Sequence, residues 1–137
     1  MLKRQITRYL IIGIPNAAID FGFVNLASYI FNTYKGPLII PINFGGFFFA
    51  TLNSYFMNKF WNFQDGEKTN PKQMSVFFGV AAVGAIVNTA ILYLLTTFIP
   101  LDEVVGKEIW LNVAKLFATV IQIILNFVGY KFVVFKN

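Results

Sequence analysis

The chain has 137 residues, of which 57% are hydrophobic and 12% are charged, and its mean hydropathy is +0.65. A soluble domain carries about 25% charged residues, and one of this length has too small a core to hide so much apolar surface. Eleven Lys and Arg against six Asp and Glu give a net charge of +5, and the chain has no Cys and no His. The composition therefore excludes disulfides, thiolate metal sites and His-based catalysis, and it predicts an integral membrane protein without a cofactor.

Four long apolar runs follow one another along the chain, at residues 9–31, 38–58, 74–99 and 109–130. Each is long enough to cross a hydrocarbon core of about 30 Å, which takes about 20 helical residues. The stretches between them carry Gly, Pro, Asn and Asp, which are typical of turns. The sequence predicts an all-α integral membrane protein, a single domain over residues 1–137 in which four transmembrane helices form two similar hairpins.

The first run, 9–31, follows a basic start, as the apolar region of a signal peptide does. It is longer than that region usually is, contains Asp20 and has no convincing small-residue cleavage site. We therefore expect a membrane span here. Within it, Asn16 and Asp20 stand four residues apart, on one side of a helix.

Polar side chains recur at helical spacing in the later runs as well. They are Asn43 and Asn53 in the second run, Asn88 in the third, and Lys115, Thr119, Gln122 and Asn126 in the fourth. Amides and small residues hydrogen-bond and pack across helix interfaces in membranes, which is one interpretation of these stripes. The other interpretation is a polar groove, which gains weight because all four runs carry such a stripe.

Asp20 and Lys115 need a partner or water, because an ionised side chain in hydrocarbon costs roughly 2.5 to 3.5 kcal/mol. Asp20 lies about 18 Å beyond Arg8 at the helical rise, and thus about 12 Å below the opposite face of the membrane. Lys115 follows Trp110 by about 8 Å, measured from that same face. The matched depths predict a buried Asp20–Lys115 pair, which is either structural or part of a path for a charged headgroup.

Positive charges mark one side of the membrane. The residues on that side are Lys3, Arg4, Arg8, Lys59, Lys68, Lys72, Lys131 and Lys136, whereas the other side has Lys35 and Lys107. Because cytoplasmic flanks are enriched in Lys and Arg, both termini are predicted to be cytoplasmic. Trp61 and Trp110 then fall near opposite interfaces, where amphipathic rings anchor helices, and the same position is expected for Tyr130.

The two halves of the chain resemble each other. A shift of 68 residues places Asp20 on Asn88 and residues 49–51 on 117–119. A shift of 72 superposes the ends of the second and fourth runs, where Ser54, Lys59, Phe60 and Phe63 meet Asn126, Lys131, Phe132 and Phe135. Each hairpin begins and ends on the cytoplasmic side, so the pattern predicts a parallel repeat.

Several short motifs, in this order and spacing, resemble those of the GtrA-like proteins over nearly the whole chain. They are Arg8-Tyr9-Leu10 with Gly13, Asn16 and Asp20, then residues 58–63, then Ala114-Lys115, Asn126, Tyr130-Lys131-Phe132 and Phe135. The resemblance implies a small four-span protein of the cytoplasmic membrane in cell-surface polysaccharide biosynthesis or glycosylation. Such a protein is expected to flip a polyprenyl-phosphate-linked sugar across that membrane.

In that setting Arg8, Lys59 and Lys131, at the cytoplasmic ends of three spans, are candidates for gripping the lipid phosphate, with Lys115 further along the path. Positive-inside anchoring explains the three terminal cations equally well. The expected polar groove consists of Asn16, Asp20, Asn53, Asn88, Gln122 and Asn126, with Trp61 and Tyr130 as interface aromatics. No bond is made or broken in this function, so no catalytic residue is expected.

The expected partners are the polyprenyl-phosphate sugar lipid, a membrane glycosyltransferase of the same pathway and a second copy of the chain, since four helices make a thin wall for a groove. No nucleic acid partner is expected. Two other functions remain open. One is an adaptor that positions a glycosyltransferase, and the other is a small proton-coupled cation exporter that uses Asp20.

Overall fold

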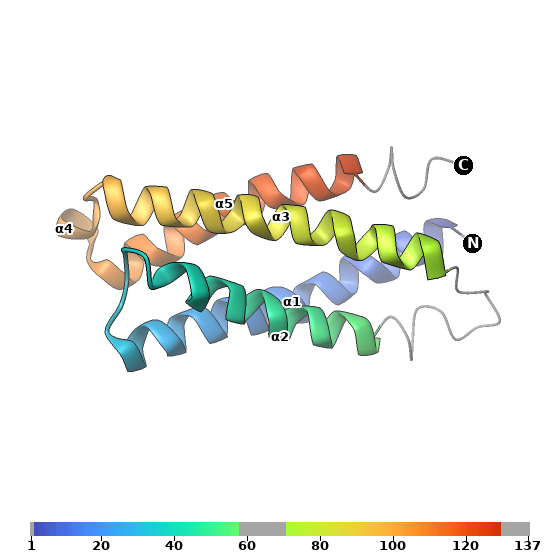
Figure 1. Cartoon of the computed structure of the whole chain (residues 1–137), viewed down its shortest axis with the longest axis horizontal. Coiled ribbons are helices and arrows are strands. Elements are labelled where there is room, and N and C mark those ends of the chain that lie inside the picture. The colour runs from blue at the N-terminus through green and yellow to red at the C-terminus, as the bar shows by residue number, and fades with distance from the viewer. Residues whose placement is uncertain (1, 58–70, 130–137) are drawn as a thin grey trace.

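The computed structural model describes residues 2–57 and 71–129, and it is helical throughout those segments apart from short connections (Figure 1). The elements in chain order are α1 (Leu2–Phe31), α2 (Ile39–Met57), α3 (Pro71–Phe98), α4 (Asp102–Val105) and α5 (Lys107–Gly129). The described residues contain no strand.

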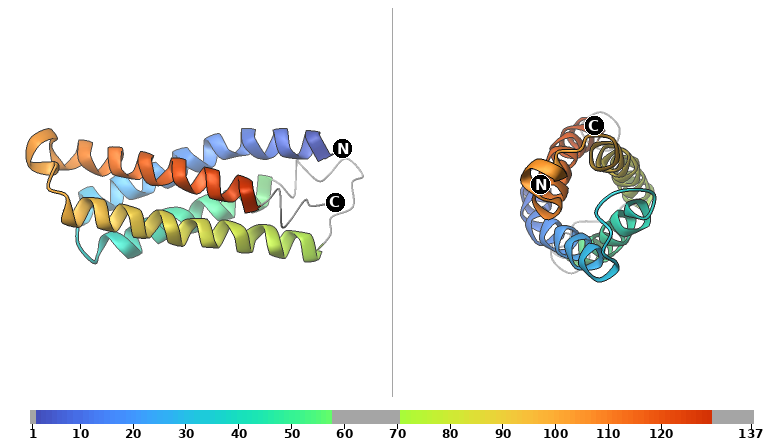
Figure 2. Two further views of the ribbon diagram at one scale, coloured as in Figure 1. Left: turned by 90° about the horizontal axis from the view of Figure 1, so that it is seen from above. Right: turned by 90° about the vertical axis from the view of Figure 1, so that its left-hand side faces the viewer.

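The four long helices form two antiparallel hairpins, α1 with α2 and α3 with α5, and these two pairs pack most extensively. Smaller contacts of α2 with α3 and of α1 with α5 close a four-membered ring, seen end-on in Figure 2. Helix α1 begins and α5 ends at the same end of the bundle (Figure 1). The opposite end, called the loop end below, carries the α1–α2 connection and α4.

Three helical segments are long and apolar enough to cross a membrane by length and composition, namely Leu10–Phe31, Phe78–Phe98 and Lys107–Gly129. The apolar part of α2, Ile39–Ser54, is shorter, but the 19 residues of α2 rise about 28 Å, close to the thickness of a hydrocarbon core. The chain is thus an all-α membrane protein with four spanning helices, as its four apolar runs predict.

Helix boundaries differ modestly from the predicted runs. Helix α1 begins at Leu2 rather than at residue 9 and continues through Pro15, whose missing N–H is tolerated in membrane helices where neighbouring groups adjust. Pro71 opens α3, a position where a proline costs no helical hydrogen bond. The short helix α4 was not predicted, because the Pro and Gly around it indicate a plain turn.

Two turns at the loop end depend on left-handed backbone. After α1 ends, Asn32 has φ 48° and Gly36 has φ 86°, and Gly106, between α4 and α5, has φ 95°. Asn and Gly are the residues that adopt this region at low cost. They let the chain reverse within a few residues at both connections.

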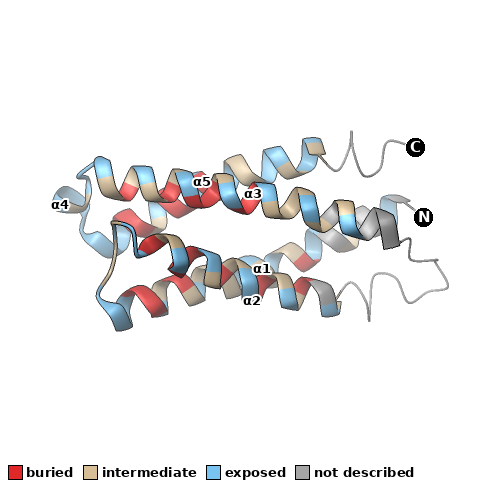
Figure 3. Cartoon of the chain, viewed as in Figure 1, coloured by how far each residue is buried: buried red, intermediate tan, exposed pale blue. Residues whose placement is uncertain are grey.

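The apolar core lies toward the loop end. Its buried residues are Val24, Ala27, Ile39, Ile42, Leu92, Leu111 and Ala114. On α5 the buried residues fall between Trp110 and Ala118, and none of residues 119–129, all described, is buried. Figure 3 shows the buried residues of α5 gathered in one part of the helix. Large apolar side chains such as Phe117 and Phe127 are exposed on the outer surface, as expected for contact with lipid tails.

Candidate functional site

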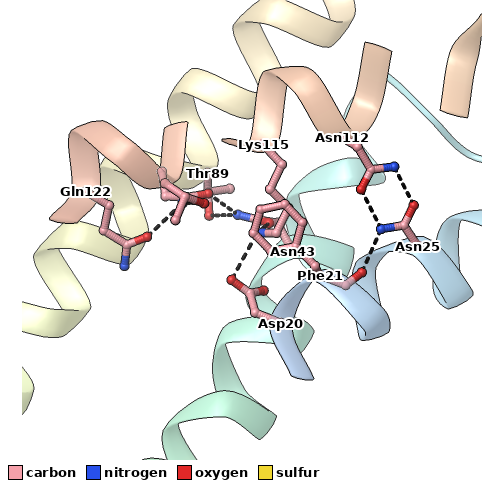
Figure 4. Close-up of polar contacts among 10 residues, drawn as sticks. Asp20, Phe21, Asn25, Asn43, Thr89, Asn112, Lys115 and Gln122 are labelled. Atoms are coloured by element: carbon pink, nitrogen blue, oxygen red, sulfur yellow. Dashed lines mark hydrogen bonds and ion pairs between the residues drawn. The ribbon is translucent and has the colours of Figure 1, made fainter. Parts of the chain in front are cut away.

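An ion pair lies at the middle of the bundle, between α1 and α5. Lys115 Nζ is 3.0 Å from Asp20 Oδ2 and donates a hydrogen bond of 2.7 Å to Asn43 Oδ1 on α2 (Figure 4). The lysine is 1% exposed, so its charge is neutralised by protein groups rather than by water. The pairing predicted from matched depths is confirmed.

The polar contacts continue from Asn43 onto α3 and back to α5. Asn43 donates to Asn88 Oδ1 at 3.1 Å and to Thr89 Oγ1 at 2.8 Å. Asn88 in turn donates to Gln122 Oε1 at 2.7 Å and to Thr119 Oγ1 at 3.2 Å. One connected network therefore draws on all four long helices. Asp20, Asn43, Asn88 and Lys115, one from each helix, are called the polar quartet below.

The polar quartet follows the internal repeat. Asp20 corresponds to Asn88 by the shift of 68, and Asn43 lies 72 residues before Lys115, which is the shift that superposes the ends of α2 and α5. The Asp20–Lys115 pair therefore has a counterpart in the Asn88–Asn43 hydrogen bond. The Asn43–Lys115 bond joins the two equivalent positions to each other. Equivalent positions of a parallel repeat thus meet at the centre. One pair, Asp20 with Lys115, is charged, whereas the equivalent pair, Asn88 with Asn43, is neutral.

Asp20 is held tightly. Its Oδ1 atom is buried and has no hydrogen-bond partner, and a Cβ atom on Gly46 of α2 would overlap it. Gly46 thus lets the carboxylate sit directly against the backbone of α2. The Phe21 ring lies 5.2 Å from Lys115 Nζ and adds an aromatic face on another side of the ammonium group. A buried oxygen that lacks a donor is uncommon and needs an explanation.

A second polar contact between α1 and α5 lies about one helical turn closer to the loop end. Asn25 and Asn112 exchange two hydrogen bonds of 2.8 and 2.7 Å, visible in Figure 4. Neither residue was predicted to belong to the site. A signal was present, since Asn112 stands three residues before Lys115 and Asn25 five after Asp20, so their depths also match.

The other predicted groove residues lie in separate contacts. Asn53 donates to Asn16 Oδ1 at 2.7 Å, within the α1–α2 hairpin. The buried Oδ1 of Asn126 has no hydrogen-bond partner and faces Gly84 of α3, where a Cβ would overlap it. Asp20, Asn88, Lys115 and Gln122 are therefore joined in one network, whereas Asn16, Asn53 and Asn126 lie apart from it.

Four predicted residues, Lys59, Lys131, Trp61 and Tyr130, fall outside the described residues. Arg8 lies on α1 and is partly buried. Trp110 was expected to anchor at an interface, but it is 8% exposed, and its indole N–H donates to the Leu95 carbonyl at 3.2 Å. That expectation is wrong because the ring packs inside the α3–α5 hairpin, where the buried N–H needs a partner.

Polar contacts also join the two connections at the loop end, and this set is called the loop clasp below. Lys35 Nζ is 3.0 Å from Asp102 Oδ2, and Lys107 donates to Asn32 Oδ1 at 3.2 Å while lying 4.9 Å from the centre of the Tyr34 ring. The Gly36 N–H donates to Thr97 Oγ1 at 2.9 Å. The clasp links the α1–α2 hairpin to the α3–α5 hairpin.

The arrangement of the site supports binding of a polar, anionic group. Across the described part of the chain, no group of three acidic side chains is placed to hold a metal ion. The polar quartet offers an ammonium group for an anion, and amides and hydroxyls that replace water around a polyol. The quartet lies in an apolar bundle, where these interactions are less screened than in water.

Comparison with known proteins gives a family match along most of the sequence. Residues 8–135 match the family described as GtrA/DPMS, transmembrane domain. The chain is 29% identical over 136 residues to the cell wall teichoic acid glycosylation protein GtcA of Listeria monocytogenes, an alignment that covers 96% of this chain and 85% of that protein. No solved structure matches the chain. Because the family match runs from α1 past the end of α5, the chain belongs to the GtrA/DPMS transmembrane-domain family.

Proposed function

We propose that this protein flips a polyprenyl-phosphate-linked sugar across the cytoplasmic membrane for the glycosylation of a cell-surface polymer. The observation that carries the proposal is the polar quartet, a buried cation–anion–amide network at the centre of an apolar four-helix bundle. Membership in the GtrA/DPMS family and similarity to a teichoic acid glycosylation protein support a role in glycosylation.

The physical task is to move a phosphate and a sugar through a region that rejects both, while the polyprenyl tail stays in lipid. Lys115 supplies the positive charge for the phosphate. Asn43, Asn88 and Gln122 supply donors and acceptors for sugar hydroxyls, replacing the water that the sugar loses. The apolar outer faces of the helices leave the tail in contact with acyl chains.

The proposed orientation places both termini in the cytoplasm and the loop end outside, as the distribution of Lys and Arg favours. The headgroup enters between the hairpins from the cytoplasmic end, where no residue of the 119–129 part of α5 is buried. Arg8, Lys59 and Lys131 receive the phosphate there, and Asn16, Asn53 and Asn126 border the route. Use of the lipid by a glycosyltransferase on the outer side then sets the direction of net transport.

The geometry disfavours the cation exporter. An exporter of organic cations needs a membrane carboxylate that its substrate can reach, but the Asp20 carboxylate is already bound to the buried Lys115. A fixed ammonium group beside the carboxylate repels a second cation and attracts an anion. The network therefore fits an anionic headgroup better than a cationic drug.

The test is leaflet translocation of a synthetic polyprenyl-phosphate sugar in proteoliposomes that contain the purified protein. A sugar-specific reagent that does not cross the bilayer reports how much lipid reaches the outer leaflet. We expect flipping with the wild-type protein and its loss with Lys115→Gln, Lys59→Ala and Lys131→Ala. Lys3→Gln, which removes one exposed charge near the N-terminus, is the matched control and is expected to flip normally.

The outcomes separate the two remaining functions. Loss of flipping in a variant that still folds supports the translocase. Flipping at the protein-free rate across several sugars refutes it and favours the adaptor, which needs a glycosyltransferase partner but no polar path. The same preparation in nanodiscs, examined by native mass spectrometry, tests the proposed homodimer.

A further inference from the structure

The charges of the polar quartet balance when the site is empty. Lys115 contributes one positive charge and Asp20 one negative charge, 3.0 Å apart, while Asn43 and Asn88 are neutral. A charge without a partner in hydrocarbon costs several kcal/mol. The empty site is therefore stable because its net charge is zero. A loaded site, one that holds a bound lipid headgroup, must also have a net charge of zero.

A phosphodiester headgroup upsets this balance. It brings one negative charge, and its recognition in the proposed function uses the ammonium group of Lys115. The lysine then faces two anions, the carboxylate and the phosphodiester, but it carries a single positive charge. One negative charge is left over in a region where an unpaired ion is not tolerated.

In the described part of the chain, no second cation faces Asp20 to neutralise it. Helix α2 faces Asp20 with Gly46 and Asn43, α3 brings Asn88 to the network, and α5 brings Lys115. The acidic residue of α5, Glu108, lies seven residues before Lys115 and is exposed, so it does not add a further charge beside Asp20. Among the described residues that face Asp20 from the packed helices, Lys115 is the charged one.

The Asp20 carboxylate also has no second donor to replace Lys115. Its Oδ1 atom already lies against the backbone of α2 at Gly46 without a hydrogen-bond donor. The side chain is 19% exposed, so water reaches it only in part. A proton from that water is the simplest source of the missing positive charge, and the resulting acid gains an O–H donor.

We infer that a phosphodiester anion replaces the Asp20 carboxylate on Lys115 and that Asp20 takes up one proton from water as it is displaced. This inference rests on the proposed function. The loaded site then holds an ammonium ion, a phosphodiester anion and a neutral carboxylic acid, so that empty and loaded sites both have zero net charge. Translocation is electroneutral, and lipid binding is coupled to proton binding at Asp20.

The probe is a short-chain polyprenyl-phosphate-glucose, a phosphodiester whose own charge does not titrate near neutral pH. It is titrated into purified protein in phosphatidylcholine nanodiscs by calorimetry, in buffers of different ionisation enthalpy, which gives the number of protons taken up. We expect about one proton per lipid, with affinity rising up to about tenfold for each pH unit that the pH falls. The glucoside without phosphate is expected to cause no uptake.

Asp20→Asn keeps the shape of the side chain and removes the titrating group. It is expected to bind the phosphodiester without proton uptake and with an affinity that does not change with pH. Asp102→Asn is the matched control, since Asp102 is paired with Lys35 at the same distance of 3.0 Å but in the loop clasp. This control is expected to retain the uptake.

Binding by the wild-type protein without proton uptake overturns the inference and leaves the translocase standing, and so does uptake that persists in Asp20→Asn. The absence of any phosphodiester binding overturns both the inference and the proposed function. If Asp20→Asn does not fold, the wild-type protein still tests the inference, because binding without proton uptake or without pH dependence overturns it.

Discussion

Lys115 shows how a single residue constrains this bundle. A fully buried lysine keeps its charge only with a partner, and Asp20 and Asn43 take its hydrogen bonds at 3.0 and 2.7 Å. The sequence located this pair because charges are rare in apolar runs and helical rise converts spacing into depth. The sequence did not predict the contact between Asn25 and Asn112, because a lone amide in a membrane helix is far more common than a lone charge.

Removing one partner of the pair is expected to cost more than removing both. Asp20→Ala leaves a buried ammonium ion unpaired and should lower the free energy of unfolding by about 3–5 kcal/mol. The double variant Asp20→Asn/Lys115→Gln carries no charge at this point and should recover much of that loss. Denaturant unfolding in detergent micelles measures the free energy of unfolding of both variants. A double variant less stable than Asp20→Ala would contradict the charge-balance argument.

At the scale of elements, close helix approach depends on a few small residues. Gly46 of α2 lies against Asp20 of α1, and Gly84 of α3 lies against Asn126 of α5. The sequence predicted the four long helices well, because apolar length and flanking turns are local properties. It did not predict α4 or the early start of α1, because short helices and helix ends depend on packing and on local hydrogen bonds.

Gly46→Ala should disturb the site without changing any polar group. The added methyl overlaps Asp20 Oδ1, with the Asp20 carbonyl oxygen and Val24 Cγ2 also close, so the α1–α2 hairpin must move apart locally. We expect reduced flipping and a lower thermal unfolding temperature. Gly22→Ala is the control on α1, since a Cβ there meets no atom within 4 Å. Equal behaviour of the two variants would argue against close packing at Gly46.

The amide pair between α1 and α5 should be energetically coupled. Asn25 and Asn112 exchange two hydrogen bonds, and side-chain hydrogen bonds between membrane helices contribute about 0.6 kcal/mol on average and up to about 1.7. A double-mutant cycle with Asn25→Leu and Asn112→Leu should give a coupling energy of about 1 kcal/mol. Strictly additive effects would show that the pair adds no stability.

At the scale of the whole molecule, the two ends of the bundle are built differently. The apolar core and the loop clasp lie at the loop end, whereas the 119–129 part of α5, toward the other end, has no buried residue. A headgroup that enters at the opposite end and leaves at the loop end requires the clasp to open. The Lys35–Asp102 pair, whose lysine is half exposed, adds little stability, which suits a contact that must open.

Fixing the loop clasp should therefore stop transport. The chain has no cysteine, so Lys35→Cys/Asp102→Cys introduces a unique pair that a short bismaleimide can join. The cross-linked protein is expected to bind the lipid from the cytoplasmic side but not to flip it. The double variant labelled with a monofunctional maleimide should flip normally. Undiminished flipping by the cross-linked protein would show that the hairpins need not separate at the loop end.

The sequence by itself determined that the chain is a four-helix membrane protein built from two similar hairpins, and it identified the charged pair at the centre. These features follow from composition, apolar length and the cost of charge in hydrocarbon, all of which are readable along the chain. Only the tertiary structure decided which neutral amides join that pair, that Trp110 faces inward, and that the two connections form a clasp. Those contacts depend on helix rotation and on packing between segments up to 75 residues apart, which no local pattern encodes.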